Sequence, residues 1–438
     1  MPGTPRSAAR KPSSLRHASD RPDRTERERE RGERGETASG KERERDRERD
    51  QSRRTPSDAI SLRNRASSPN SRKEKERERT KRRTSASPRR RLEPRLPNDY
   101  KAVPVPATNM YWSRAPTHGL LPSRPTRAHT ATLVDSTVWL FGGCDERGCC
   151  ADVWTFDTDS FLFSRPDTQG DPPPPCRAHS ATLVDRKIVF FGGGQGPVYY
   201  NATWILDTTT HRWIKPTFII PEGKDPEDYT PAPRRAHTAV LYDNKIWVFG
   251  GGNGLQALAD LWALDVSGSV DKLKWEKVET GGDEKPSPRG YHTANLVGDI
   301  MVVIGGSDGK ECFSDVWCLN LRTMWWTRVD SLTKAPSYRR LSHTSTQVGS
   351  YLFVIGGHDG SSYSSDVLLY NLVSLQYEPR VIRGRPPTAR GYHVALIADS
   401  RLFTFGGFNG HDVFDDVHIL ELAGAAYLPQ VMSFAIPI

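Results

Sequence analysis

The sequence predicts an all-β fold, a six-bladed β-propeller that follows a long disordered tail. Three observations predict it: an apolar run that ends in two glycines occurs six times, the occurrences are 50 to 58 residues apart, and no helical period of apolar residues runs through the repeats. A repeat of this length with this motif is typical of propeller blades. The glycine pairs are Gly142-Gly143, Gly192-Gly193, Gly250-Gly251, Gly305-Gly306, Gly356-Gly357 and Gly406-Gly407.

Each repeat divides into four short strands. The first strand begins at a histidine, and a short turn separates it from a second strand that ends at the glycine pair. Glycine suits this point because it tolerates a positive φ and a close neighbouring backbone. A third strand, such as Asp152 to Asp157, opens with an aspartate in every repeat but the second, and a fourth strand carries an aromatic residue. The histidines are His129, His179, His237, His292, His343 and His393.

Ring closure also has a trace in the sequence. The segment Met110 to Arg114 reads as a fourth strand ahead of the first repeat. We expect it to pair with the last blade through Trp112, which would leave no open sheet edge, and Tyr427 is the alternative. The predicted divisions are a tail at 1–104, a propeller at 105–430 and a C-terminal extension at 431–438.

These features together resemble the kelch-repeat family over roughly residues 108 to 430. The resemblance rests on the lead-in before each histidine, the double glycine, the Asp-Val-Trp third strand and the late aromatic residue. It implies a propeller that serves as a platform for binding other proteins, although one fold hosts many functions. A propeller beside a disordered extension is similar to the cytoplasmic kelch scaffolds of cell polarity and trafficking, such as the fungal tip-elongation proteins and the Rab9 effector with kelch motifs.

The first 100 residues carry the positive charge of the chain. They hold 31 Lys and Arg against 18 Asp and Glu, whereas the remaining residues hold 31 against 35. No aromatic residue occurs before Tyr100, so this segment cannot bury enough apolar surface to offset the entropy of ordering it. We therefore expect a disordered tail, and nucleic acid as a partner only through that tail.

The tail also contains candidate modification and import signals. Phosphorylation is predicted at hydroxyl groups that precede a proline or follow arginines, namely Thr55, Ser68, Ser85 and Ser87. The basic stretch from Lys81 to Arg91 is a candidate nuclear import signal, which phosphate groups would weaken by adding negative charge.

The recurring polar residues indicate structural roles. A histidine at the same place in every repeat is best explained by a hydrogen bond inside its blade, and the aspartate of the third strand by turn capping. Cys144, Cys149, Cys150 and Cys176 lack the paired spacing of a zinc site. The sequence therefore predicts no catalytic residue, no metal ion, no cofactor and no enzymatic activity.

One face of the propeller is the predicted partner-binding surface. In a four-stranded antiparallel blade, the lead-in and the loop after the glycine pair emerge on the same face. One arginine per lead-in favours an acidic or phosphorylated segment of a partner protein, and the alternative is that these arginines pair with aspartates inside the blades. The predicted contact residues are Arg127, Arg177, Arg235, Arg289, Tyr291, Arg340, Arg390, Tyr392, Tyr199, Asn253, Asp308, His358 and Asn409.

The sequence thus predicts a non-enzymatic scaffold or adaptor that binds other proteins, with a role in cell polarity or trafficking. Two alternatives stay open: a substrate receptor of a ubiquitin ligase, and a nuclear adaptor that reaches RNA or chromatin through the basic tail. No signal peptide and no run of about 20 apolar residues is visible, so we expect a cytoplasmic protein without a membrane span.

Overall fold

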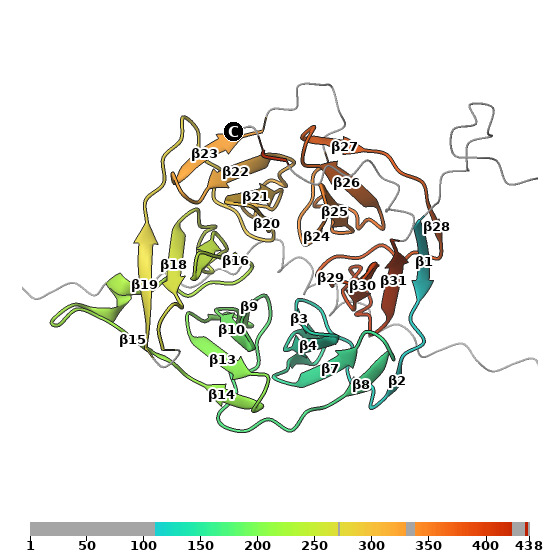
Figure 1. The fold of residues 1–438 in the computed structure, drawn as a ribbon, viewed down its shortest axis with the longest axis horizontal. Coiled ribbons are helices and arrows are strands. Elements are labelled where there is room, and N and C mark those ends of the chain that lie inside the picture. The colour runs from blue at the N-terminus through green and yellow to red at the C-terminus, as the bar shows by residue number, and fades with distance from the viewer. Residues whose placement is uncertain (1–109, 270–271, 330–337, 423–433, 437–438) are drawn as a thin grey trace, which may run out of the picture. The chain divides into compact units, whose positions relative to one another are not determined.

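The structure, a computed structural model, describes residues 110–269, 272–329, 338–422 and 434–436. These residues form six blades around a central axis, each with four main antiparallel strands (Figure 1). The predicted all-β class and the count of six blades are confirmed. The predicted tail, its phosphorylation sites, its import signal and Tyr427 lie outside the described residues.

The strands of each blade follow one another from the centre of the ring outward (Figure 1). Blade 1 contains β3 (Thr130–Val134), β4 (Thr137–Phe141), β7 (Val153–Asp157) and β8 (Leu162–Ser164). Blade 2 contains β9 (Ser180–Val184), β10 (Lys187–Phe191), β13 (Thr203–Asp207) and β14 (Arg212–Ile214). Blade 3 contains β16 (Thr238–Tyr242), β17 (Lys245–Phe249), β18 (Leu261–Asp265) and β19 (Lys272–Val278). Blade 4 contains β20 (Thr293–Val297), β21 (Ile300–Ile304), β22 (Val316–Asn320) and β23 (Trp325–Arg328).

The last two blades repeat this pattern. Blade 5 contains β24 (Thr344–Val348), β25 (Tyr351–Ile355), β26 (Val367–Asn371) and β27 (Gln376–Glu378). Blade 6 contains β29 (Val394–Ala398), β30 (Arg401–Phe405), β31 (Val417–Glu421) and β1 (Met110–Arg114). Each first strand begins one residue after its histidine, not at the histidine as the sequence predicted.

The hydrophobic core is divided into six clusters, one between each pair of neighbouring blades. Adjacent residues of one strand serve different clusters, because side chains alternate between the two faces of a sheet. In β10, Phe190 packs against blade 1, and Phe191 packs against blade 3. The second strands are therefore apolar on both faces, which explains the apolar runs before the glycine pairs.

Both glycines of every pair have a positive φ, as the sequence suggested. At Gly306 φ is 97°, and an added Cβ would lie 2.7 Å from the carbonyl oxygen of Gly290 and 2.8 Å from His292 Cβ. At Gly305 an added Cβ would lie 2.5 Å from the carbonyl oxygen of Arg340 in the next blade. The glycine pairs are therefore contact points between blades.

The strand β1 closes the ring as predicted. It pairs antiparallel with β31 in the last blade, where Trp112 is opposite Leu420, and it is covered on its outer edge by β28 (Ile382–Gly384). Trp112 is buried in the cluster between blades 5 and 6. The outer strands β8 and β19 are covered in the same way by the parallel strands β2 (His118–Gly119) and β15 (Thr217–Phe218), which protects these sheet edges.

A ring of backbone hydrogen bonds joins the six lead-ins. The residue just before each histidine has a φ of 55° to 58° and donates its N–H to the carbonyl oxygen of the equivalent residue in the preceding blade. The ring closes where Ala128 donates to Tyr392 over 2.7 Å. Its members are Ala128, Ala178, Ala236, Tyr291, Ser342 and Tyr392.

Candidate partner-binding face

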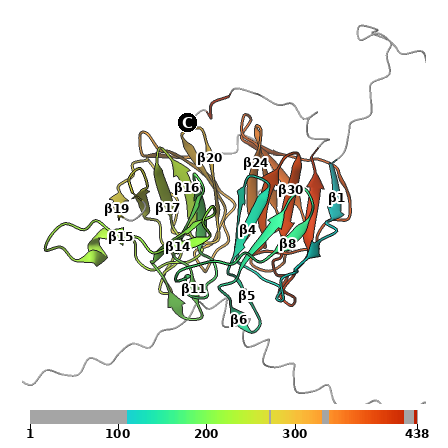
Figure 2. The same ribbon diagram turned by 60° about the horizontal axis from the view of Figure 1, so that its bottom comes forward.

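The lead-ins and the loops after the glycine pairs lie together on one face, as predicted. In each blade a backbone bridge joins the two, for example between Arg127 and Cys144 and between Arg177 and Gly194. In blades 1 and 2 the loop is a short hairpin, built from β5 (Cys144–Asp145) with β6 (Gly148–Cys149) and from β11 (Gly194–Gln195) with β12 (Val198–Tyr199). Figure 2 shows β5, β6 and β11 at the same side of the ring.

The six predicted arginines belong to two different positions. Arg127, Arg177 and Arg235 stand two residues before the histidine, whereas Arg289, Arg340 and Arg390 stand three residues before it. The predicted ring of one arginine per lead-in combined these two positions. Because side chains alternate along an extended chain, a shift of one residue directs the guanidinium group to another side.

The arginines of the second group are buried inside the blades. Arg289 is fully buried, and its guanidinium group donates to both carboxylate oxygens of Asp315 over 2.6 and 3.0 Å and to the carbonyl oxygen of Gly305 over 3.0 Å. Arg340 donates to Asp366 over 2.7 Å, and Arg390 donates to Asp416 in the same way. This arrangement corrects their assignment as partner contacts, because a guanidinium group that is buried and paired is not presented to a partner.

The same ion pair occurs in blade 3, where the sequence analysis missed it. Arg234 is fully buried and donates to Asp260 over 2.8 and 2.9 Å. Burial by itself would raise the pKa of Asp260, but the hydrogen bond and the charge of Arg234 hold that pKa below its ordinary value. The aspartate that opens the third strand is therefore a charged partner in blades 3 to 6 and not only a turn cap. We call this contact the lead-in ion pair.

The arginines of the first group form what we call the arginine sector: Arg127, Arg177 and Arg235, in blades 1 to 3. Arg127 lies over the ring of Phe408, with its guanidinium carbon 3.9 Å from the ring centroid. Arg235 lies over Tyr199 at 4.5 Å and donates to the carbonyl oxygen of Gly196. Arg177 donates to Cys144 Sγ over 3.7 Å. These contacts hold all three side chains beside the loops of the predicted face, where Arg127 and Arg177 are half-buried and Arg235 is buried.

Aromatic residues occupy the same face in blades 4 to 6. The rings of Tyr291 and Tyr392 meet edge to face with centroids 5.7 Å apart, although blade 5 lies between their blades. His358 lies 4.9 Å from Tyr363 and 5.9 Å from Tyr392. The ring of Phe408, which the sequence analysis did not single out, contacts Tyr363. In the arginine sector the positions equivalent to Tyr291 and Tyr392 are alanines, so the face is asymmetric.

Three of the predicted contact residues act as turn caps in the loops after the glycine pairs. Asn253, Asp308 and Asn409 each accept two backbone N–H groups through one side-chain oxygen, over 2.7 to 3.0 Å. This is the geometry of an Asx turn. Their identity is therefore explained by loop structure, whereas Tyr199 and Tyr392 are held by contacts across the face.

The recurring histidines have a structural role, and five of them bond through Nε2 to the preceding blade. The predicted contact inside the blade occurs at His129, whose Nδ1 lies 3.3 Å from Thr126 Oγ1, and at His179, whose Nδ1 lies 3.4 Å from Cys176 Sγ. His179 Nε2 lies 2.9 Å from Thr130 Oγ1 of blade 1, and the same bond joins each later histidine through His393 to a hydroxyl of the preceding blade. Burial lowers the pKa of His129 to about 4 and that of His343 to about 3, so these imidazoles are neutral. His129 Nε2 differs, because it has no hydrogen-bond partner among the described residues.

The cysteines of blade 1 form a cross-strand pair. Cys144 and Cys149 are opposite each other in the hairpin of β5 and β6, and their mutual hydrogen bond together with Arg177 and Arg127 lowers the pKa of Cys144. In the described residues, no group of three or more His, Cys, Asp or Glu side chains is placed to hold a metal ion. The same residues include no helix of the length and apolarity needed to cross a membrane.

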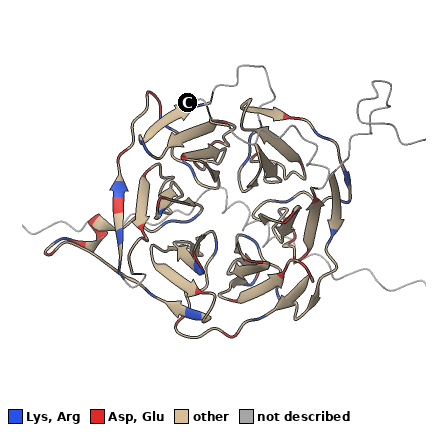
Figure 3. Cartoon of the chain, viewed as in Figure 1, with Lys and Arg blue, Asp and Glu red and all other residues tan. Residues whose placement is uncertain are grey.

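Charged residues of both signs are distributed around the whole ring (Figure 3). Blue and red positions both occur on β19, and a blue position occurs on β14. The local arrangement of the arginine sector, and not the net charge, therefore distinguishes one part of the face from another.

Comparison with known proteins gives matches along most of the chain. The KLHDC2/KLHL20/DRC7 Kelch-repeats domain matches residues 98–228, 223–407 and 342–430. The leucine-zipper-like transcriptional regulator 1 homolog of Drosophila melanogaster is 27% identical over 252 residues, which is 56% of this chain and 25% of that protein. The leucine-zipper-like transcriptional regulator 1 of Homo sapiens is 29% identical over 266 residues, 60% of this chain and 31% of that protein.

A third relative shows the same pattern. Host cell factor 1 of Homo sapiens is 31% identical over 220 residues, which is 44% of this chain and 10% of that protein. The matched part of this chain thus spans less than a third of the length of these relatives.

Proposed function

Because this chain belongs to the kelch-repeat family, we propose that its propeller is a scaffold that binds an acidic segment of another protein through the arginine sector. The observation that carries the proposal is the position of Arg127 and Arg177, which are only half-buried and lie in two consecutive blades beside the loops of one face. Guanidinium groups form strong charge-assisted hydrogen bonds with carboxylates and phosphates.

The aromatic contacts of the sector support the same function. A guanidinium group that lies on an aromatic ring keeps its edge available for hydrogen bonds, and it loses less side-chain entropy when it binds. Arg127 on Phe408 has this arrangement. The rings of Tyr291 and Tyr392 lie across the face and offer apolar contact area to the same segment.

Selection of a displayed library of random peptides on the full chain tests the proposal. We expect the selected peptides to be rich in Asp and Glu, and we expect Arg177→Glu to lose them while its melting temperature stays that of the wild type. Losing one charge-assisted hydrogen bond costs about 1.5 to 3 kcal/mol, which is roughly ten- to a hundredfold in affinity. Selected peptides without an acidic bias, or equal binding by Arg177→Glu, would refute the proposal.

The proposal also includes a cellular role for the scaffold. We propose an adaptor in the cytoplasm that acts in polarity or trafficking, and the alternatives are a ubiquitin-ligase substrate receptor and a nuclear adaptor that uses the basic tail. Proximity labelling of the full chain, compared with a version that lacks residues 1 to 100, separates the three. Labelled trafficking proteins, cullin subunits, or RNA- and chromatin-bound proteins that are lost with the tail would identify one role each.

A further inference from the structure

The loop after the glycine pair contains a cross-strand pair of residues in every blade, and in blade 1 both members are cysteines. The first member follows the second glycine directly, and the residue opposite it comes five positions later. In blade 1 the two are Cys144 and Cys149. The pairs of the other blades are Gly194 with Tyr199, Gly252 with Ala257, Ser307 with Cys312, His358 with Tyr363 and Phe408 with Val413. Among the six loops, two facing thiols therefore occur only in blade 1.

The backbone of the hairpin brings these two thiols close together. The N–H and the C=O of Cys144 both bond to the backbone of Arg127 over 3.0 Å, so neither is directed at Cys149. Cys144 and Cys149 are thus a non-hydrogen-bonded pair, in which the Cα atoms of antiparallel strands are about 4.5 Å apart and the side chains lie on the same face. A disulfide spans this separation, so it can form here without a shift of the backbone.

The surroundings of the pair favour a thiolate, the form of cysteine that reacts with oxidants. The hydrogen bond with Cys149 lowers the pKa of Cys144, and burial opposes this shift. The charges of Arg177 and Arg127 lower the same pKa further, and Arg177 donates to Cys144 Sγ over 3.7 Å. Cys149 is half-buried in a hairpin that projects from the ring (Figure 2), so a small oxidant can reach the pair.

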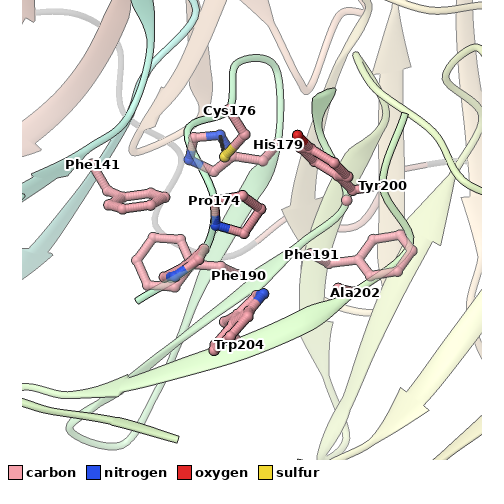
Figure 4. Close-up of a pocket in the computed structure, with 11 residues that line it drawn as sticks. Phe141, Pro174, Cys176, His179, Phe190, Phe191, Tyr200, Ala202 and Trp204 are labelled. Carbon is pink, nitrogen blue, oxygen red and sulfur yellow. Dashed lines mark hydrogen bonds between the residues drawn. The ribbon is translucent and has the colours of Figure 1, made fainter. Parts of the chain in front are cut away.

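None of the other cysteines in the described part of the chain belongs to a cross-strand pair of thiols. Cys150 is buried and donates to a carbonyl oxygen of the glycine pair over 3.3 Å. Cys176 lines a small pocket, where its Sγ lies 3.4 Å from His179 Nδ1 (Figure 4). Burial raises the pKa of Cys150, and it raises the pKa of Cys312 to about 11 and that of Cys176 and Cys318 to about 12. These thiols stay protonated near neutral pH and react slowly.

We propose that Cys144 and Cys149 are a site of reversible oxidation, where hydrogen peroxide joins the two sulfur atoms in a disulfide. The thiolate of the pair attacks one oxygen of the peroxide, so that the O–O bond breaks, a sulfenic acid forms and the leaving hydroxide takes up a proton to become water. The second sulfur then attacks the sulfenic sulfur. The S–O bond breaks, the S–S bond forms, and the thiol proton leaves with the hydroxide as a second water. Two electrons pass from the sulfur atoms to the peroxide.

Oxidation also strengthens the binding of an acidic segment by the arginine sector, a consequence that rests on the proposed function. In the reduced protein a thiolate at Cys144 offsets part of the charge of Arg177, whose Nη1 lies 3.7 Å from Sγ, and of Arg127. A disulfide is uncharged, so both guanidinium groups attract a carboxylate more strongly after oxidation. The expected gain in affinity is about two- to fivefold, the size of one partly exposed charge contact.

Peptide mapping of the full chain tests the oxidation site. The protein is reduced, treated with hydrogen peroxide and alkylated. Trypsin then cuts after Arg147, between the two cysteines, so the disulfide holds two peptides together. We expect this linked pair at a peroxide concentration that leaves Cys312 alkylated, and we expect dithiothreitol to remove the link. Cys312 is the matched control, because it occupies the position of Cys149 in blade 4 but is opposite a serine.

Two variants identify the sulfur atoms of the link. Cys149→Ser should abolish it, and Cys150→Ser should retain it. A link that requires Cys150, the absence of a link, or oxidation of Cys312 at the same peroxide concentration would overturn the oxidation site.

Binding of the acidic peptides, selected on the reduced full chain, tests the effect on the arginine sector. The double variant Cys144→Ser with Cys149→Ser has no thiolate, so it should bind these peptides as tightly as the oxidised wild type does, with or without peroxide. A disulfide that forms without a gain in affinity would overturn the effect on the arginine sector and leave the oxidation site standing. A selection without acidic peptides would overturn the proposed function and with it this effect, while the peptide mapping decides the oxidation site independently.

Discussion

Val394 leaves His129 without the hydrogen bond that the equivalent histidine has in each of the other five blades. At every other blade junction, the residue after the histidine of the preceding blade is a threonine or serine whose hydroxyl bonds to Nε2, as Thr344 does to His393 over 3.2 Å. At the junction of blades 6 and 1 this residue is Val394, and His129 Nε2 is buried without a partner among the described residues. The two ends of the propeller sequence meet at this junction.

The first prediction follows from this difference. Val394→Thr adds a hydroxyl with little change of volume, so it should raise the free energy of unfolding by about 0.5 to 1.5 kcal/mol. The control Thr344→Val removes the equivalent bond of His393 and should lower that free energy by about 1 to 3 kcal/mol. Urea denaturation of the two variants checks both values. A Val394→Thr variant less stable than the wild type would contradict the prediction.

The second prediction concerns the glycine pairs. Gly306→Val should lower the free energy of unfolding by more than about 2 kcal/mol, because its φ of 97° and the contact with the Gly290 carbonyl oxygen both exclude a side chain. Gly298 has a φ of 64° but no atom within 4 Å of an added Cβ, so Gly298→Val measures the backbone strain alone. We expect Gly298→Val to lose less stability than Gly306→Val. Equal decreases of the melting temperature in the two variants would show that crowding does not contribute.

The third prediction separates the two groups of arginines. Arg289→Ala leaves Asp315 without its partner in a partly buried site and should lower the free energy of unfolding by about 3 kcal/mol. Arg177→Ala should change it by no more than about 0.5 kcal/mol, as most substitutions outside the core do. Chemical denaturation provides the values. Equal stability of Arg289→Ala and the wild type would show that the lead-in ion pair does not support the fold.

The fourth prediction is a dependence on pH. Burial lowers the pKa of His343 to about 3, whereas an exposed histidine titrates near 6.5, so the unfolded chain binds more protons below that pH. The contribution of the neutral histidine is complete above about pH 6.5 and is lost as the pH falls toward the folded pKa. Between about pH 7.5 and 5.5 this loss is at most about 1.4 kcal/mol for one histidine.

A His343→Asn variant checks this dependence, because asparagine does not titrate. The free energy of unfolding of the variant should fall less than that of the wild type between the two pH values, by up to about 1.4 kcal/mol. Urea denaturation at both pH values gives the difference. The same fall in both proteins would mean that His343 is not the titrating group.

Much of the fold was predictable because its signals are local and repeated. The glycine pairs set the number of blades, since a positive φ and a crowded backbone are properties of the position itself. Trp112 indicated the closing strand because its segment has the pattern of a fourth strand but precedes the first repeat. The structure places Trp112 opposite Leu420 of the last blade. The shared face of lead-ins and loops also followed from strand order alone, and the backbone bridges confirm it.

The sequence by itself thus determined the six blades, their strands and the face on which the loops gather, because each depends on short-range geometry that repeats with the chain. Only the tertiary structure decided which arginines form an ion pair inside a blade. Arg235 and Arg289 both precede a histidine closely, but their one-residue offset places the first over Tyr199 and the second in an ion pair with Asp315. It also placed Ile436 in the cluster between blades 4 and 5 and opened a pocket beside Cys176. These outcomes depend on how side chains from distant parts of the chain pack together. Such packing does not recur with the repeat, so no sequence pattern indicates it.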